Sequence, residues 1–565
     1  MDVEGTINGE SLNGSESADV IRGKGGHDVI RGLGGDDTIY AGGGHDTLHG
    51  NDGNDVIYGG GGWDTMYGEG GNDTLYGGLA TDLLYSGTGD DRLYGEAGED
   101  DFYFGANLSA GDTADGGTGI LDTLWLQGNY GTFGPAAVPF AFAASHLVNV
   151  EQLLLLPGNN TRFGDMAGNS YSYNLATVDA NVAANQRLGV YFNTLRAAES
   201  VIFNGAAETD GSFAISGSVA KDVLSGGQKD DEIRGGGGHD VVHGLGGNDL
   251  IYAGGGHDRL YGEDGIDTVY AGGGEDAVYG GAGNDVLHGG EANDLLDAGT
   301  GTDALYGDAG NDSFYFGANL SAGDVVDGGT GTRDALWLQG IYTAANAVTF
   351  GASQLLGIEW VHVLSGADTR FGGSGPATRY NLTMNEANVA AGQTLAIVGR
   401  DLSASEPLLF NGTAETNGQF SIVGGAGDDT LTGGAGNDWI LGGLGIDTLR
   451  GGSGNDIFVY SDARQSRDGA FDYVRDFETE QDKIDLSLID AIAGTPGDDA
   501  FNYVGINNFT GAPGELSLQG GGSGSWYLVG SIDGVLNEFG SQYDIIMAVG
   551  DGQTPAPLTV ADLIL

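Results

Sequence analysis

Large apolar residues recur every nine positions along three stretches of this chain, and each lies two residues after an aspartate. In the first stretch these apolar positions are Ile21, Ile30, Ile39, Leu48, Ile57, Met66, Leu75, Leu84, Leu93 and Phe102. Each of these apolar residues, together with the residue on either side of it, predicts a three-residue strand in which the apolar side chain points inward. The glycine-rich segments in between predict tight turns, because Gly adopts positive φ without steric penalty. Two strands and two turns therefore make one coil of eighteen residues.

The aspartates of this pattern form the candidate site. The repeat reads G-G-x-G-x-D-x-U-x, with U the apolar residue, and is represented by Gly68–Tyr76. The aspartates are Asp19, Asp28, Asp37, Asp46, Asp55, Asp64, Asp73, Asp82, Asp91 and Asp100, then Asp222, Asp231, Asp240, Asp249, Asp258, Asp267, Asp276, Asp285, Asp294, Asp303 and Asp312, and finally Asp429, Asp438, Asp447 and Asp456. Aspartates eighteen residues apart stack on one side of the coil, so each groove offers carboxylate and carbonyl oxygens but no nitrogen or sulfur. This donor set favours calcium over magnesium, because the ligands are many and octahedral geometry is not enforced.

The nonapeptide resembles the calcium-binding repeat of RTX (repeats-in-toxin) proteins, which fold as a parallel β-roll. The resemblance implies an all-β fold with parallel β-roll solenoids. Counting aspartate pairs eighteen residues apart gives eight, nine and two sites in the three rolls, or roughly nineteen Ca²⁺ ions.

The composition changes between the rolls. Residues 105–216 and 317–423 contain fewer glycines and more alternating apolar residues, which predict β-rich modules on a conventional hydrophobic core. A unit of roll plus module is duplicated in tandem, since segment 77–112 aligns with 289–324. Duplication of a whole unit favours a structural or binding array over a single-site enzyme.

The C-terminal segment has a third pattern. Residues Phe471–Ser487 contain D-x-V-x-D-F and D-K-I-D-L-S, which are similar to the C-terminal domain of serralysin-type secreted metalloproteases. The resemblance covers about 424–565 and implies a β domain that caps the last roll. From the residues we also expect a short helix over Leu486–Ala493. The resemblance further implies an uncleaved type I secretion signal that ends at Asp562–Leu565. No H-E-x-x-H string occurs, so zinc proteolysis is not expected.

The predicted order is roll 1 (11–104), module A (105–216), roll 2 (217–316), module B (317–423), and roll 3 with the serralysin-like cap and secretion signal (424–565).

The charge narrows the choice of partners. Eighty acidic and twenty basic residues give a formal charge of −60, which disfavours binding to nucleic acid or anionic lipid. Stacked carboxylates repel each other by roughly 3 to 4 kcal/mol per pair, so we expect the rolls to be unfolded without metal.

The sequence has no cysteine, no apolar run that could span a membrane, and no Sec-type signal after Met1. We therefore expect export by type I secretion machinery and folding on extracellular calcium, free or at the cell surface.

Two functions remain open. The first is a structural or adhesive matrix or surface-layer component, and the alternative is an extracellular hydrolase or polysaccharide-modifying enzyme with its site in the modules. No catalytic motif is found, and His27, His45, His239 and His257 are expected to be exposed turn residues. Outward tyrosines at eighteen-residue spacing predict two ladders, Tyr40–Tyr58–Tyr76–Tyr94 and Tyr67–Tyr85–Tyr103. These ladders are explained by cross-strand stacking, or by a strip for cell-surface polysaccharide or self-assembly.

Overall fold

The computed structural model describes residues 1–163, 169–343, 347–372, 375–467, 469–492, 499–520, 526–533, 545–550 and 558–565. These residues fold into two compact units, Met1–Gly290 and Glu291–Leu565. The described residues contain no α-helix, and their helical turns are the short 3-10 segments η1 (Asp179–Asn181), η3 (Ala463–Gln465) and η4 (Val560–Asp562). The all-β prediction is confirmed.

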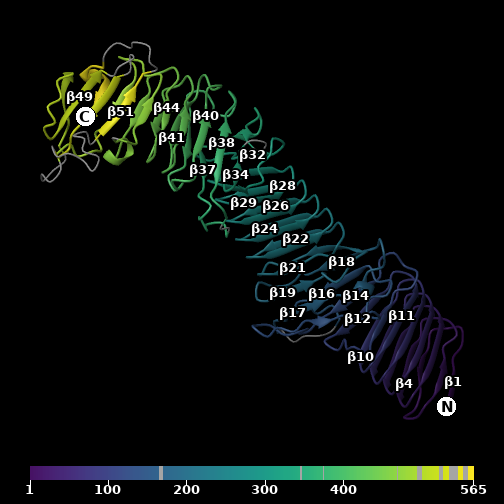
Figure 1. The fold of residues 1–565 in the computed structure, drawn as a ribbon. Helices are drawn as coiled ribbons and strands as arrows, with labels where there is room; N and C mark the ends of the chain where they lie inside the picture. The colour runs from purple at the N-terminus through teal and green to yellow at the C-terminus, as the bar shows by residue number, and fades with distance from the viewer. Residues whose placement is uncertain are drawn as a thin grey trace. The chain divides into compact units, whose positions relative to one another are not determined.

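In the first unit, successive strands along the chain enter different parallel sheets, so that one coil contributes one strand to each sheet. One sheet contains β1 (Asp2–Glu4), β3 (Val20–Arg22), β5 (Thr38–Gly43), β7 (Val56–Gly61), β9 (Thr74–Leu79), β11 (Arg92–Ala97) and β13 (Thr113–Asp115). The second contains β2 (Ser11–Asn13), β4 (Val29–Gly34), β6 (Thr47–Asp52), β8 (Thr65–Gly70), β10 (Leu83–Thr88), β12 (Asp101–Gly105), β14 (Thr123–Leu126), β16 (Gln152–Leu155), β18 (Arg187–Tyr191), β20 (Ser212–Ser216), β22 (Glu232–Gly237), β24 (Leu250–Gly255) and β26 (Thr268–Gly273). A third contains β15 (Phe140–Ala141), β17 (Tyr173–Ala176), β19 (Val201–Asn204), β21 (Val223–Ser225), β23 (Val241–Gly246), β25 (Arg259–Asp264) and β27 (Ala277–Ala282), and β28 (Val286–Glu291) follows along the chain. Figure 1 shows these strands side by side as successive rungs, from purple at β1 to teal.

The second unit repeats this arrangement and ends in the cap. Its longest parallel sheet contains β29 (Leu295–Thr300), β31 (Ser313–Gly317), β33 (Ala335–Leu338), β37 (Trp360–Val363), β39 (Thr394–Val398), β41 (Gln419–Val423), β43 (Trp439–Leu441), β45 (Ile457–Val459), β47 (Lys483–Asp485) and β52 (Leu563–Ile564). A second sheet contains β34 (Ile341–Tyr342), β38 (Arg379–Thr383), β40 (Leu408–Asn411), β42 (Thr430–Thr432), β44 (Thr448–Arg450), β46 (Asp472–Val474), β51 (Ile545–Val549), β50 (Trp526–Gly530), β49 (Glu515–Gly520) and β48 (Asn502–Ile506), and β35 (Val348–Thr349) pairs with β38. The strands β30 (Ala304–Ala309), β32 (Val325–Asp327) and β36 (Leu355–Leu356) pair in parallel.

The inward apolar residues of the rolls stack at matching positions. Ile39 lies opposite Ile57, and Leu48 lies opposite Met66, each in a parallel register of eighteen residues. All ten inward residues predicted for roll 1 are fully buried. The core of a roll is therefore a column of such side chains with two per coil, as the nine-residue period predicted.

The parallel ladder continues where the glycine repeats end. In module A, β12 pairs with β14, and the ladder runs on through β16, β18 and β20 to β22. Module B shows the same progression from β31 through β33, β37, β39 and β41 to β43. Buried aromatic rings widen the core here, with Phe203 and Phe213 in edge contact at 5.5 Å. The modules are β-rich, and they extend the solenoid with longer loops between rungs.

The cap differs from the rolls because part of it is antiparallel. β49, β50 and β51 pair antiparallel, while β51 pairs with β46 in parallel. The short helix expected over Leu486–Ala493 is wrong, because residues 486–492 form turns; residue 493 lies outside the described residues. The carboxylate of Asp485 accepts the N–H of Ser487, and that of Asp490 accepts the N–H of Ile492. Such local bonds to backbone N–H groups stabilise turns in place of a helix.

Candidate metal sites

The roll aspartates form hydrogen-bonded ladders along the solenoid. Every one of the twenty-five predicted aspartates is buried, with at most 4% of its surface exposed. Asp73 is typical, because its Oδ1 accepts the N–H of Asp55 at 2.8 Å and its own N–H donates to Oδ1 of Asp91 at 2.8 Å. The same bond joins Asp231 to Asp249 and Asp438 to Asp456, at 2.8 Å in both pairs. The stacking predicted from the eighteen-residue spacing is therefore present in all three rolls.

The second carboxylate oxygen, Oδ2, accepts a backbone N–H at the first aspartates of the rolls, namely Asp19, Asp222, Asp231, Asp429 and Asp438, but in the described residues it lacks a donor at many of the later ones. Several buried Oδ2 atoms accept no hydrogen bond from any of the described residues. They belong to Asp28, Asp37, Asp46, Asp55, Asp64, Asp73, Asp82, Asp100, Asp240, Asp249, Asp258, Asp267, Asp312, Asp447 and Asp456. A buried acceptor without a donor is costly and rare in folded proteins. A periodic row of such atoms indicates sites that a cation completes.

The turn glycines bring carbonyl oxygens to the same place. A Cβ atom at Gly32 would lie 2.2 Å from Oδ2 of Asp37 and 2.7 Å from the carbonyl oxygen of Gly50 in the next coil. A Cβ atom at Gly71, where φ is +127°, would lie 1.8 Å from the carbonyl oxygen of Gly53. Glycine is needed at these positions because oxygen atoms of two coils occupy the space. The donor set is all oxygen, which suits calcium.

Burial changes the acidity of these carboxyl groups. Desolvation raises the pKa of Asp55 to about 6, of Asp73 to about 7 and of Asp91 to about 6, against the partial compensation of one backbone N–H donor each. Desolvation together with neighbouring carboxylates raises the pKa of Asp82 and of Asp249 to about 8. A negative charge is therefore unfavourable in these grooves unless a cation shares them.

Six further aspartates extend the ladders, and the nine-residue pattern missed them. Asp91 donates its N–H to Oδ1 of Asp112 at 2.6 Å, and Asp100 donates to Oδ1 of Asp122 at 2.7 Å. The same bonds lead from the ends of rolls 2 and 3 to Asp324, Asp334, Asp472 and Asp482. In the described residues, the buried Oδ2 atoms of Asp122, Asp334 and Asp472 also lack a donor.

A signal for these six aspartates was present in the sequence. Each of the six precedes a buried apolar residue by two positions, as Asp122 precedes Leu124 and Asp334 precedes Leu336. The D-x-U part of the repeat survives at all six, and G-G-x-G survives before Asp122 and Asp334, but the nine-residue phase is lost. The ladder then passes to glutamate, since Asp122 donates its N–H to Glu151 and Asp334 to Glu359, both at 2.8 Å.

Two other buried carboxylates in the modules, Glu199 and Glu406, are surrounded by hydrogen-bond donors. Burial raises the pKa of Glu406, but donors from Ser403, Gly366 and Thr378 outweigh it and bring that pKa to about 2. Glu199 in module A has the same low pKa, because Arg196 and backbone N–H groups outweigh its burial. These two carboxylates fasten module loops.

One carboxylate cluster lies outside the ladders. Oxygens of Asp179, Glu208 and Asp210 lie within 4.8 Å of one another in module A. In module B, Asn417 stands where Asp210 does, and its amide donates to Glu386 at 2.5 Å. The two copies thus differ in charge at this turn.

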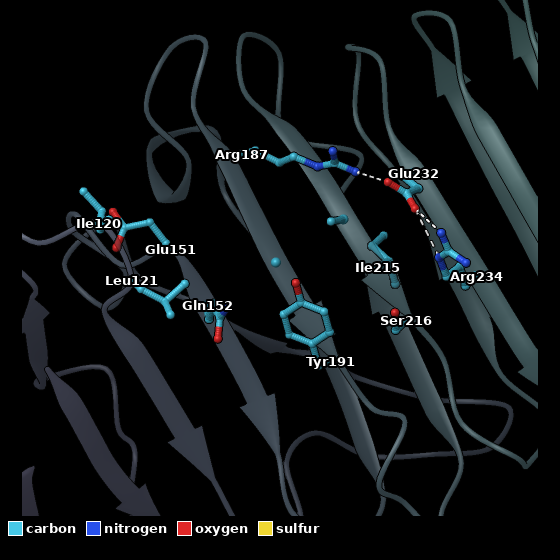
Figure 2. A pocket seen from close by; sticks show the side chains of 12 residues that line it. Ile120, Leu121, Glu151, Gln152, Arg187, Tyr191, Ile215, Ser216, Glu232 and Arg234 are labelled. Atoms are coloured by element: carbon cyan, nitrogen blue, oxygen red, sulfur yellow. Dashed lines mark hydrogen bonds and ion pairs between the residues drawn. The ribbon is translucent and has the colours of Figure 1, made fainter. Parts of the chain in front are cut away.

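Module A also has a polar pocket of about 530 Å³ over β16, β18, β20 and β22 (Figure 2). Figure 2 shows Arg187 and Arg234 directed at Glu232, and Glu232 bonds to them at 2.9 and 2.5 Å. Arg234 and then Arg187 hold the pKa of Glu232 below its usual value. The other acid, Glu151, accepts the N–H of Asp122. Both acids of this pocket are engaged by donors, so the pocket does not present a free acid and base.

The histidines lie where the repeat predicted them. His27, His45, His239 and His257 are exposed in turns, and His27 stacks on His45 with ring centroids 5.0 Å apart.

The fold and the ladders define a calcium-binding class of parallel β-solenoid. Comparison with protein-family models agrees with this assignment. The model of the RTX calcium-binding nonapeptide repeat matches residues 13–48, 40–75, 76–107, 216–251, 252–287 and 288–319. The model of the peptidase M10 serralysin C-terminal family matches residues 410–531. These matches confirm both resemblances seen in the sequence: the chain contains RTX calcium-binding nonapeptide repeats and a segment that matches the serralysin C-terminal family. No protease-domain family matches the chain. A comparison with curated proteins found no match.

Proposed function

We propose that this protein binds calcium along its aspartate ladders, is exported by a type I system, and folds on extracellular calcium. The proposal rests on the row of buried Oδ2 atoms that have no donor in the described residues, many of which share their space with carbonyl oxygens of the turns. RTX repeats bind calcium, and serralysin-type domains are typical of type I secreted proteins.

The metal ligands in this proposal are the twenty-five roll aspartates together with the turn carbonyl oxygens. Pairs eighteen residues apart account for roughly nineteen ions. Asp112, Asp122, Asp324, Asp334, Asp472 and Asp482 would extend the binding sites beyond the repeats. Bound calcium would supply the positive charge that the buried carboxylates lack.

The biological role that we propose is structural or adhesive, as a matrix or surface-layer component outside the cell. Two copies of roll plus module give a repeated surface, as expected of an array. In the described residues no helix has the length and apolarity needed to cross a membrane. The hydrolase alternative gains no support from the pocket in Figure 2, because its acids are held by donors.

A calcium titration tests the core of this proposal. In calcium-free buffer we expect an expanded chain with little β signal, and in millimolar calcium a compact chain with strong β signal. Circular dichroism and hydrodynamic radius measure both changes, and magnesium at equal concentration is the control. An unchanged spectrum and radius across the calcium titration would contradict metal-driven folding.

A further inference from the structure

A cluster of three carboxylates in module A lies away from the aspartate ladders. Asp179 is the first residue of η1, and Glu208 and Asp210 lie in the turn between β19 and β20. One carboxylate oxygen of each residue lies within 4.8 Å of the other two. None of the three falls within the segments that match the RTX repeat or the serralysin C-terminal family. The calcium-binding repeats therefore do not account for this cluster.

Glu208 gives an independent indication of a cation. Its side chain is fully buried, and its Oε1 accepts the N–H groups of Asp210 and Gly211 at 3.2 and 2.8 Å. Its other oxygen, Oε2, is also buried and accepts no hydrogen bond from the described residues. A buried carboxylate oxygen without a donor is costly, and a cation beside it would remove most of that cost.

The two exposed members of the cluster are held in place by backbone and hydroxyl groups. The hydroxyl and the N–H of Thr209 donate to Oδ1 of Asp179 at 2.6 and 2.9 Å, and the N–H of Asn185 donates to the carbonyl oxygen of Asp210 at 2.8 Å. The donors of Thr209 lower the pKa of Asp179, so this carboxylate is ionised at neutral pH. Because Asp179 and Asp210 are exposed, water can reach the open side of the cluster.

We propose that Asp179, Glu208 and Asp210 bind one calcium ion, which joins the η1 loop to the turn between β19 and β20. This site is additional to the aspartate ladders, and it rests on the proposed calcium-driven folding of the chain. Oxygen ligands on opposite sides of a calcium ion lie roughly 4.6 to 5.2 Å apart, so three oxygens within 4.8 Å of one another can contact one ion. Three carboxylates in one site favour calcium over magnesium, which is usually bound by one or two carboxylates and keeps several waters.

Module B shows how the same turn is joined without a third carboxylate. Asn417 stands there in place of Asp210, within the matching strings FNGTAETNG and FNGAAETDG. The amide of Asn417 donates to Glu386 at 2.5 Å, and so a neutral donor links the two loops directly. The buried Oε2 of Glu415 also lacks a donor in the described residues, so the two copies share the buried acid and differ in the third ligand. In module A that third group is a carboxylate, which repels its neighbours unless a cation lies between them.

Reciprocal substitutions in the calcium-loaded full chain test the inference. Asp210→Asn gives module A the residue of module B, and Asn417→Asp makes the opposite change. Each variant carries a residue that the other copy already accepts, so we expect both to fold in calcium, as circular dichroism can verify. Atomic emission of desalted protein should find one calcium ion fewer per chain in Asp210→Asn and one more in Asn417→Asp. Equal calcium content in the two variants would overturn the inference.

Anomalous diffraction from crystals of the calcium-loaded chain locates the ions one by one. We expect a calcium peak in contact with Asp179, Glu208 and Asp210, and we expect this peak to be lost in Asp210→Asn while the peaks along the ladders remain. A map with ladder peaks and no peak at the cluster would overturn the inference alone. A map without ladder peaks would overturn the proposed function, so the two failures can be told apart.

Discussion

Within the rolls, aspartates such as Asp37 use their two carboxylate oxygens differently. Oδ1 of Asp37 accepts the N–H of Asp19 at 2.7 Å and so holds two coils in register. Oδ2 of the same residue has no donor in the described part of the chain, and lies against Gly32 and the carbonyl of Gly50. One atom therefore serves the fold, and the other faces the space proposed for calcium.

Gly32→Ala is expected to destabilise the calcium-bound roll by about 1–3 kcal/mol, the usual cost of forcing extra atoms into a packed site. The added Cβ would meet Oδ2 of Asp37 and a backbone carbonyl, and that carbonyl cannot move without shifting a coil. Denaturant unfolding in saturating calcium measures the loss. Gly43→Ala is the control, because a Cβ there has nothing within 4 Å. Equal stability of the two variants would show that the turn tolerates a side chain at Gly32.

The pH dependence of the metal-free protein follows from the raised pKa values. The pKa values of Asp82 and Asp249 rise to about 8 in the fold, from 3.8. Between those values the folded state binds more protons than the unfolded state, so stability without calcium increases as pH falls from about 8 toward 4. We expect β signal to return when calcium-free protein, prepared by dialysis, is brought from pH 8 to pH 5.

Calcium should reverse this trend, because it competes with protons for the same carboxylates. Its apparent affinity should rise with pH up to about 8, as the carboxyl groups of Asp82 and Asp249 lose their protons. Circular dichroism at each pH, with and without calcium, checks both directions. A calcium-free protein that gains structure as pH rises would contradict the assignment of the buried carboxyls.

At the scale of the element, the hydrogen-bonded aspartate ladder extends beyond the nine-residue repeats from which it was predicted. Asp122 lies in module A, yet it is bonded to Asp100 as the roll aspartates are bonded to one another. We expect Asp122→Asn to lower the calcium content by about one ion per chain and to lower the thermal midpoint in calcium, because a terminal groove loses a charged ligand.

Asp115→Asn is the matched control for that variant. Asp115 lies on β13 and bonds to the amide of Asn149 at 2.8 Å, outside the aspartate ladder. Atomic emission of desalted protein counts the calcium, and calorimetry gives the thermal midpoint. Equal calcium content in both variants would place Asp122 outside the metal sites.

The sequence predicted the rolls because one rule generates them. Asp73 and Leu75 can be assigned from spacing alone, since every coil has the same length and every turn needs its glycines. The modules obey no fixed spacing, so the parallel pairing of β14 with β16 could not be predicted from a period. The helix expected after Leu486 failed because carboxylates of Asp485 and Asp490 take the local N–H groups.

At the scale of the whole molecule, the two copies share a fold and differ at particular outward positions. Tyr85 corresponds to Asp297, and Asp210 corresponds to Asn417, while the inward residues and ladders are kept. The substituted side chains point outward, whereas the inward positions stay apolar and the ladder positions stay aspartate in both copies. A duplicated solenoid can therefore gain different partners on each copy without losing its metal-dependent core.

The proposed type I secretion signal lies in the C-terminal segment, and its residues are also part of the fold. Leu563 on β52 lies opposite Ile484 on β47, and Asp562 accepts the N–H of Glu480 at 2.8 Å. The family match to the serralysin C terminus ends at 531, so this tail lies beyond it. Since the folded cap buries Leu563, a secretion machine could read the tail only before the cap folds. A chain that stays unfolded until it meets external calcium meets that condition.

We expect the double substitution Leu563→Ser and Ile564→Ser to retain the protein inside a producing cell that has the type I machinery. The rolls of the purified variant should still fold in calcium, because their ladders lie in other coils. Leu488→Ser is the control, since Leu488 lies in the same domain with 61% of its surface exposed and should not affect export. Immunoblots compare the amount of each variant in the medium and in the cells, and circular dichroism reports the folding of each purified variant. The two measurements together distinguish loss of the secretion signal from loss of the fold. Undiminished secretion of the double variant would refute the assignment of the address to this tail.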